Sequence, residues 1–134
     1  MKNNDYGGQA IALNIDKLAK ANPYFRTALW TGDYLQVTLM SIPRGSDIGT
    51  EMHEGLDQFL KIEEGSALLL MGKEKTHLCY HKLLNKGFVV FVPAGTWHNI
   101  INTGKTPLKI YSVYAPPQHP FGTVHKTKAD AEHH

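Results

Sequence analysis

The 134-residue chain has a formal net charge of +2 at pH 7 and 42% hydrophobic residues, which fits one globular domain, residues 1–134, with a real core. Its 14 basic and 12 acidic side chains are interspersed, so the charge pattern excludes a dedicated surface for nucleic acid. The one cysteine, Cys79, excludes an intrachain disulfide, and the lack of a long apolar run or a signal-like start predicts a cytoplasmic protein with no membrane segment.

A polar lead, residues 1–23, precedes the predicted strands. The sequence NIDKLAKANP offers Asn14 or Asp16 as the N-cap of a short helix, which should stop at Pro23 because the residue before a proline disfavours helical backbone. At the other end, residues 116–134 are Pro-rich and then polar. We expect this segment to cross the domain as a C-terminal strap with a weak terminal helix.

Between these ends, short β-rich runs alternate with turn signals, and the Thr31–Asp33 segment reads as a hairpin turn. The predicted strands cover residues 25–30, 34–42, 58–63, 66–71, 76–84, 88–92, 98–103 and 108–115. About eight short strands without helices between them predict an all-β fold, a closed sandwich or barrel, because closure removes exposed sheet edges.

Four polar residues in these runs have the chemistry of a metal site. Residues two apart on a strand project to the same face, so Glu51 and His53 can point together into a barrel. Gln58 follows early in the next run, and His98 arrives from a distant strand. Two imidazole nitrogens, one carboxylate and one amide oxygen would then converge on a single divalent ion.

The segment GFVVFVPAGTWHNIIN carries a recognisable spacing, formed by Gly87, Pro93, Gly95, His98 and Asn102. This spacing resembles the second sequence motif of the cupins at every position. Cupins are double-stranded β-helix, or jelly-roll, barrels that commonly hold one metal ion. The resemblance covers roughly residues 34–115 and implies that this part of the chain forms the barrel core.

The first cupin motif is matched in spacing by Gly45, Glu51, His53, Gln58 and Gly65, with two departures. Glu51 stands where the family has its first histidine, and Gln58 stands where it has glutamate. The resemblance thus implies a ligand set of two imidazoles, one carboxylate and one neutral amide. The formal ligand charge stays at −1, and zinc, iron, manganese and nickel are the candidate metals.

This ligand inventory is similar to that of type I phosphomannose isomerases, which hold zinc with two His, one Glu and one Gln. That likeness implies a small metalloenzyme that isomerises a sugar or sugar acid, with the ion acting as a Lewis acid. Two His and a carboxylate also resemble the facial triad of non-haem iron dioxygenases. A third alternative is a non-catalytic small-molecule-binding barrel, in which Glu51 and Gln58 are ordinary polar residues.

The remaining histidines have weaker signals. His77 and His81 share one face of a predicted strand but lack a nearby carboxylate, so we expect exposed or core residues. His119 and His125 lie in the strap and are expected to pack there, with the alternative of a general acid or base at the barrel mouth. The terminal His133 and His134 are either native or the stump of a tag and are set aside.

Two further expectations concern residues beside the metal site and the assembly. Asp57 is a rival for the ligand role of Gln58, but the distance in sequence from Gln58 to Gly65 fits the family spacing better. Small cupins commonly pair, so the resemblance implies a homodimer, with the apolar strands of residues 24–40 as its contact. The catalytic base cannot be named from the sequence.

Overall fold

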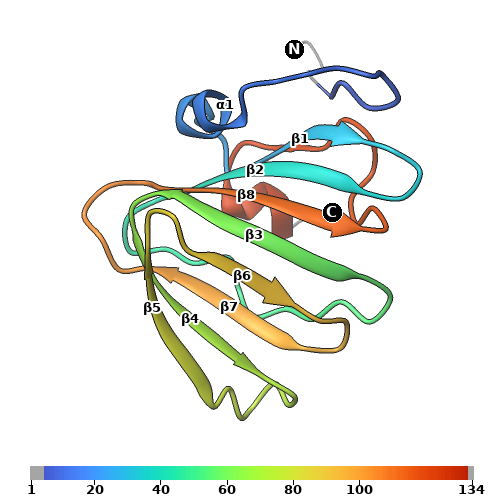
Figure 1. Cartoon of the computed structure of the whole chain (residues 1–134). Coiled ribbons are helices and arrows are strands. Elements are labelled where there is room, and N and C mark those ends of the chain that lie inside the picture. Colours follow the sequence, from blue (N-terminus) through green and yellow to red (C-terminus); the bar gives the residue numbers. More distant parts are fainter. Residues whose placement is uncertain (1–4, 133–134) are drawn as a thin grey trace.

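In the computed structural model, which describes residues 5–132, two antiparallel sheets face each other and form a jelly-roll barrel (Figure 1). The larger sheet has the strand order β6-β3-β8-β2-β1-β9, and the smaller has the order β5-β4-β7. The elements are α1 (Ile15–Ala21), β1 (Arg26–Thr31), β2 (Gln36–Ile42), β3 (Asp57–Glu64), β4 (Ser66–Gly72), β5 (Tyr80–Asn85), β6 (Val89–Val92), β7 (Trp97–Asn102), β8 (Leu108–Ala115), β9 (Val124–His125) and α2 (Lys128–Glu132). The predicted all-β class is confirmed.

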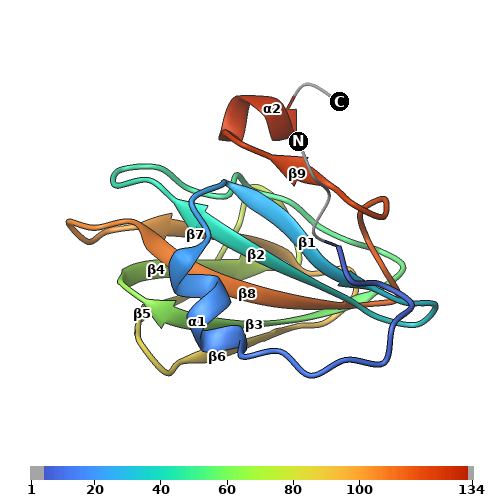
Figure 2. The same cartoon turned by 90° about the horizontal axis from the view of Figure 1, so that it is seen from above.

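The helix α1 begins at the first of its two predicted caps. The Asn14 side chain accepts a hydrogen bond from the backbone nitrogen of Lys17, which satisfies one of the free amides of the first turn. Asn22 ends the helix directly before Pro23. The helix lies across the outer face of the larger sheet, over β2, β8 and β3 (Figure 2).

This helix also bears on the expected dimer contact. Ala19 of α1 packs with Leu29 and Leu39, the buried outward residues of β1 and β2, so the chain itself covers that apolar surface. Residues 24–40 therefore do not offer these side chains to a second copy. The homodimer itself stays a prediction.

The register of the larger sheet divides the barrel interior into two ends. At one end, the inward residues Ile42, Ile62, Leu108 and Ile110 are at most 1% exposed and form an apolar core. Toward the other end, the paired strands bring polar residues together in facing rows. The inward row at that end contains Gln36, Tyr114 and Gln58, and the next row contains Thr38 and Ser112.

Three local features differ from the expected strands. The run expected at residues 76–84 becomes a strand only at Tyr80, because the residues before it form a tight turn closed by a bridge from Glu74 to His77. The pair β1 and β9 joins the larger sheet outside the expected core of residues 34–115, and β9 was not predicted at all.

Over residues 5–132, no helix is long and apolar enough to cross a membrane.

Candidate metal centre

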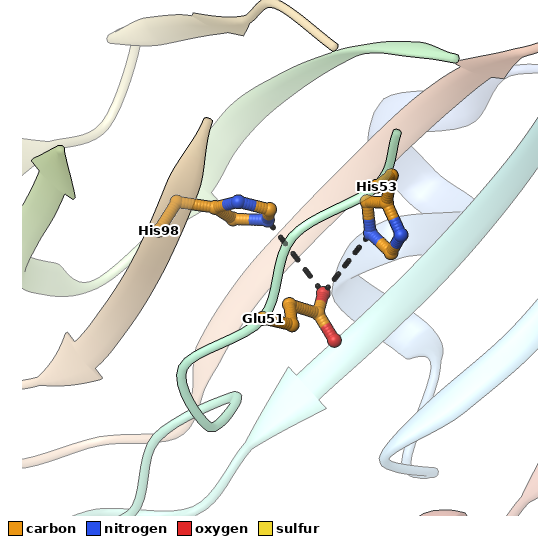
Figure 3. Close-up of side chains that lie close together, drawn as sticks. All are labelled: Glu51, His53 and His98. Atoms are coloured by element: carbon orange, nitrogen blue, oxygen red, sulfur yellow. Dashed lines mark ion pairs between the residues drawn. The ribbon is translucent and has the colours of Figure 1, made fainter. Parts of the chain in front are cut away.

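Glu51, His53 and His98 bring their ligand atoms together inside the polar end of the barrel. One carboxylate oxygen of Glu51 lies 3.4 Å from His53 Nε2 and 3.6 Å from His98 Nε2, so it sits between the two rings (Figure 3). The three ligand atoms all lie within 4.8 Å of one another. The side chains are 31%, 10% and 0% exposed in that order, so solvent reaches the group from the Glu51 side.

The backbone explains why these side chains meet. Glu51 and His98 form an isolated antiparallel bridge, in which each backbone nitrogen donates to the carbonyl oxygen of the other residue at 3.0 and 2.9 Å. Directly opposed residues of such a pair project to the same face. Our expectation that Glu51 and His53 lie on a regular strand is wrong, because residues 52–56 form an irregular loop before β3.

The loop is held in place by the turn that precedes His98. The backbone nitrogen of Gly95 donates to the carbonyl oxygen of His53 at 2.8 Å, while that of Thr96 closes the turn onto Pro93 at 3.2 Å. Gly95 has φ +82°, a conformation that glycine adopts without the steric cost of a side chain. The same Pro-Ala-Gly turn therefore positions both histidines.

The donor atoms have the spacing and the free lone pairs that a metal ion requires. Two ligands at about 2.1 Å from a shared ion lie about 3.0 to 3.5 Å apart at ordinary coordination angles, close to the observed separations. His53 Nε2 and His98 Nε2 are buried and have no hydrogen-bond partner. The Nδ1 of His98 lies 3.1 Å from the carbonyl oxygen of Thr96, which fixes the proton there and turns the Nε2 lone pair toward Glu51.

The charge of Glu51 suits the same role. Burial alone would raise the pKa of its carboxyl group, but the electrostatic attraction of the adjacent His53 and His98 imidazoles outweighs it and lowers the pKa to about 2. The carboxylate is thus anionic at neutral pH. Two imidazoles and one carboxylate fit a divalent ion such as zinc or iron.

Gln58, the fourth predicted ligand, is buried on β3 and points into the barrel. Its amide nitrogen donates to Ser112 Oγ at 3.3 Å, whereas its Oε1 atom is buried without a hydrogen-bond partner. Its rival Asp57 is exposed and accepts a hydrogen bond from the backbone nitrogen of Ala94 at 3.0 Å. Asp57 therefore stabilises the Pro-Ala-Gly turn and does not take the ligand position of Gln58.

Residues 38–114 of the chain match the family model described as Cupin domain. The chain belongs to the cupin family. It is 58% identical over 127 residues to the Bacillus subtilis (strain 168) protein YrkC, a match that covers 95% of this cupin and 68% of that protein.

Solved structures show the same barrel. The crystal structure of BH2720 from Bacillus halodurans superposes with a TM-score of 0.96 at 54% identity and covers 96% of this cupin and 98% of that chain. A predicted oxalate decarboxylase from Thermotoga maritima superposes with a TM-score of 0.56 at 26% identity, over 63% of this cupin and 69% of that chain.

A row of residues lies beside the group of Glu51, His53 and His98. The sequence analysis either assigned the residues of this row to packing or did not single them out. The ring of Tyr114 lies 5.8 Å from that of His53, and the ring of His119 lies 5.4 Å beyond Tyr114. His125 follows at 6.3 Å from His119, and Arg26 contacts His125. The strap thus contributes side chains to the interior of this cupin. The sequence did contain a signal for Arg26, because it is the one charged residue in the otherwise apolar run FRTALW.

Burial sets the protonation of Tyr114 and His119, the two rings next to Glu51, His53 and His98. Burial raises the pKa of Tyr114, and the nearby Glu51 carboxylate adds to the effect, so the phenol keeps its proton. Burial also lowers the pKa of His119 to about 3, helped by the positive charge of Arg26. The imidazole of His119 is therefore neutral at neutral pH, and its buried Nε2 has no partner.

Other predicted residues take structural roles or lie outside the site. His77 and His81 are exposed, as expected. Asn102, from the second motif, is buried and ties strands to a loop, because its amide nitrogen donates to the carbonyl oxygens of Ile42 and Thr106. His133 and His134 lie outside the described residues.

Proposed function

We propose that this cupin is a cytoplasmic, divalent-metal-dependent enzyme that acts on a small polar metabolite, in an isomerase-type reaction on a sugar or sugar acid. The observation that carries the proposal is the meeting of Glu51, His53 and His98 around two buried, unpartnered imidazole nitrogens. Leaving such polar atoms unpaired costs stability, and a bound ion would remove that cost.

Gln58 completes the proposed ligand set. Its unpartnered Oε1 lies in the same polar end of the barrel, and its neighbour across the strand pairing is Tyr114, whose ring touches that of His53. An amide oxygen adds a neutral, hard ligand without changing the charge of the site. The proposed site thus has one charged and three neutral ligands.

A divalent ion held there supplies Lewis-acid chemistry, because it polarises a carbonyl or hydroxyl oxygen of the substrate. The Tyr114 hydroxyl beside it keeps its proton and can donate a hydrogen bond to the substrate. The neutral His119 ring can hydrogen-bond the substrate, but its pKa of about 3 makes it a weak base, so the base of the isomerisation is not assigned. A proton leaves one substrate carbon and is returned to its neighbour, so the reaction needs no oxidant or reductant.

Proton transfer at carbon provides the test. Protein purified without a tag and loaded with zinc or manganese is incubated in D₂O with a panel of aldoses, ketoses and hexuronates, and NMR follows deuterium entry next to the carbonyl carbon. We expect exchange with the wild type and with the control variant His81→Ala, whose imidazole is exposed. Exchange should be lost in His98→Ala. Stoichiometric metal without exchange on any compound of the panel would contradict the isomerase.

A non-haem iron dioxygenase is the second candidate, because the group of two histidines and one carboxylate is the ligand set typical of that class. Iron-loaded protein would then consume dioxygen in the presence of its substrate, while zinc-loaded protein would not. Isotope exchange without oxygen consumption favours the isomerase, and the reverse favours the dioxygenase. If the protein takes up none of these metals, both enzyme candidates are excluded and the non-catalytic small-molecule-binding barrel is the remaining alternative.

The proposed homodimer needs apolar residues that the chain leaves exposed, which within residues 24–40 include Tyr34 and Leu35, 84% and 39% exposed. Exposed apolar residues gather on β5 and β6, where Leu83 and Phe91 are 71% and 68% exposed. Phe91 also lines a hollow of about 300 Å³ on the outer face, together with Phe59 and Val113. Light scattering that gives the mass of one 15.0 kDa chain would contradict the dimer.

A further inference from the structure

Arg26 is a buried cation in the polar end of the barrel. It is 6% exposed and lies on β1, where it pairs with His125 of β9. Its guanidinium contacts are with His125 Nδ1 at 3.2 Å, with the sulfur of Met40 at 4.0 Å and with the ring of Phe25, 5.4 Å from the ring centre. None of these partners carries a negative charge that would balance the guanidinium.

The missing counter-charge makes Arg26 unusual. Buried arginines are normally paired with carboxylates, because an unpaired charge loses its hydration without compensation. Over residues 5–132, no carboxylate forms an ion pair with Arg26, and its Nε atom is buried without a hydrogen-bond partner. A planar guanidinium with free donors is suited to bind a carboxylate.

A continuous row of rings connects this cation to the metal centre. The rings of His53, Tyr114 and His119 follow one another at 5.8 and 5.4 Å. His119 then leads to His125 at 6.3 Å, and His125 contacts the guanidinium. The charges of Glu51 and Arg26 both act on Tyr114 and His119, so the anionic and the cationic group flank the same two rings.

The strap fixes His119 in this row. The side-chain oxygen of Gln36 accepts hydrogen bonds from the backbone nitrogens of Gln118 and His119, and its amide nitrogen donates to the carbonyl oxygen of His119 at 2.8 Å. Gln36 is fully buried and thereby anchors the strap to β2. The imidazole of His119, with its unpartnered Nε2, is therefore a preset hydrogen-bonding group between the two charges.

We propose that Arg26 binds a carboxylate group of the substrate, so that this cupin acts on small hydroxy, keto or sugar acids rather than on neutral sugars. The inference rests on the proposed metal centre, because the hydroxyl or carbonyl oxygens of the same substrate would face Glu51, His53 and His98. A divalent ion would overcompensate the single charge of Glu51. Together with Arg26 it would leave the polar end positive and selective for an anion.

The test compares matched acids and neutral analogues by calorimetric titration of the zinc-loaded protein. The pairs are D-galacturonate with D-galactose and D-glycerate with glycerol. We expect at least one acid to bind the wild type more than tenfold tighter than its neutral partner. Arg26→Gln should abolish that preference while zinc content and the affinity for the neutral partner stay unchanged. Arg26→Lys should restore part of it, because lysine keeps the charge but not the two-pronged geometry.

The matched control is Arg44→Gln, which removes a positive charge from an exposed position and should leave the preference intact. Arg26→Gln should fold, since it removes a buried unpaired charge, and its thermal unfolding midpoint checks this directly. Acids that bind no better than their partners, or equally well to Arg26→Gln, would overturn the inference.

Two measurements together separate this inference from the proposed function: the zinc content of the protein, and the same titrations of acids and neutral analogues on metal-free protein. Stoichiometric zinc with no effect of Arg26→Gln on acid binding would refute the anion site and leave the metal centre intact. An Arg26-dependent preference for acids in protein that takes up no metal would refute the metal centre and support the anion site.

Discussion

The two ends of the barrel interior are built from the same strands but satisfy their side chains in opposite ways. At the apolar end, Ile42, Leu108 and Ile110 are at most 1% exposed and pack against one another. At the polar end, buried atoms lack partners. Six of the seven such side-chain atoms found in residues 5–132 belong to this end: Arg26 Nε, Thr38 Oγ1, His53 Nε2, Gln58 Oε1, His98 Nε2 and His119 Nε2.

This contrast separates the residues that stabilise the barrel from those to which we assign the proposed function. Native proteins leave few buried polar groups unpaired, because each costs about 1 to 3 kcal/mol. A cluster of them at one end therefore marks a place prepared for a ligand. The apolar end has the complementary role of stabilising the barrel against that cost.

The largest effect on stability should come from the apolar end. Ile100 is 0% exposed and packs in the main core, so Ile100→Ala should lower the free energy of unfolding by about 2 to 5 kcal/mol through lost burial and a residual cavity. Urea unfolding of the metal-free protein measures this. The folded variant should still bind metal, and a loss below 1 kcal/mol, on the order of a surface change, would contradict this division.

A polar residue at each end offers a sharper comparison. Asn102→Ala should destabilise the protein by about 2 to 3 kcal/mol, because it leaves the carbonyl oxygens of Ile42 and Thr106 without this donor. Gln58→Leu should change stability by less than about 1 kcal/mol, since it removes an unpartnered oxygen, yet it should weaken metal binding. Urea unfolding and metal titration of both variants check the pair. The comparison fails if Gln58→Leu is the less stable variant.

A smaller effect should appear in the pH dependence of stability. The pKa of His119 is lowered to about 3 in the folded chain. Below pH 6.5 the unfolded chain therefore binds a proton that the folded chain does not, and the free energy of unfolding decreases as the pH is lowered. Between pH 6.5 and 5 the wild type should lose up to about 1.6 kcal/mol more than His119→Gln. Urea unfolding of both metal-free proteins at the two pH values tests this. An equal loss in both would show that His119 titrates freely.

The sequence sufficed for features that depend on neighbouring residues. The N-cap Asn14, the strands near residues 66–71 and 108–115, and the turn at Gly95 all have local signals, and the structure contains each of them. The meeting of His53 with His98 was also predicted, through a spacing that resembles a family motif.

The features that were missed depend on contacts between distant segments. Two residues of β9 give no periodic signal, so its pairing with β1, and with it the contact between Arg26 and His125, could not be foreseen. Glu51 reached its place by a bridge to His98 rather than by the strand alternation that we assumed. Residue types and spacing thus predicted that Glu51, His53 and His98 would meet, whereas the groups around them could be identified only from the fold.

The metal content of untagged protein tests the central claim most directly. After equilibration with zinc, iron, manganese or nickel and removal of excess metal, elemental analysis should find about one ion per chain in the wild type and in the exposed-histidine control His81→Ala. His98→Ala should retain almost none, with affinity lowered more than about 100-fold. A wild type that takes up none of these metals, or a His98→Ala variant that holds as much as the wild type, would contradict the account.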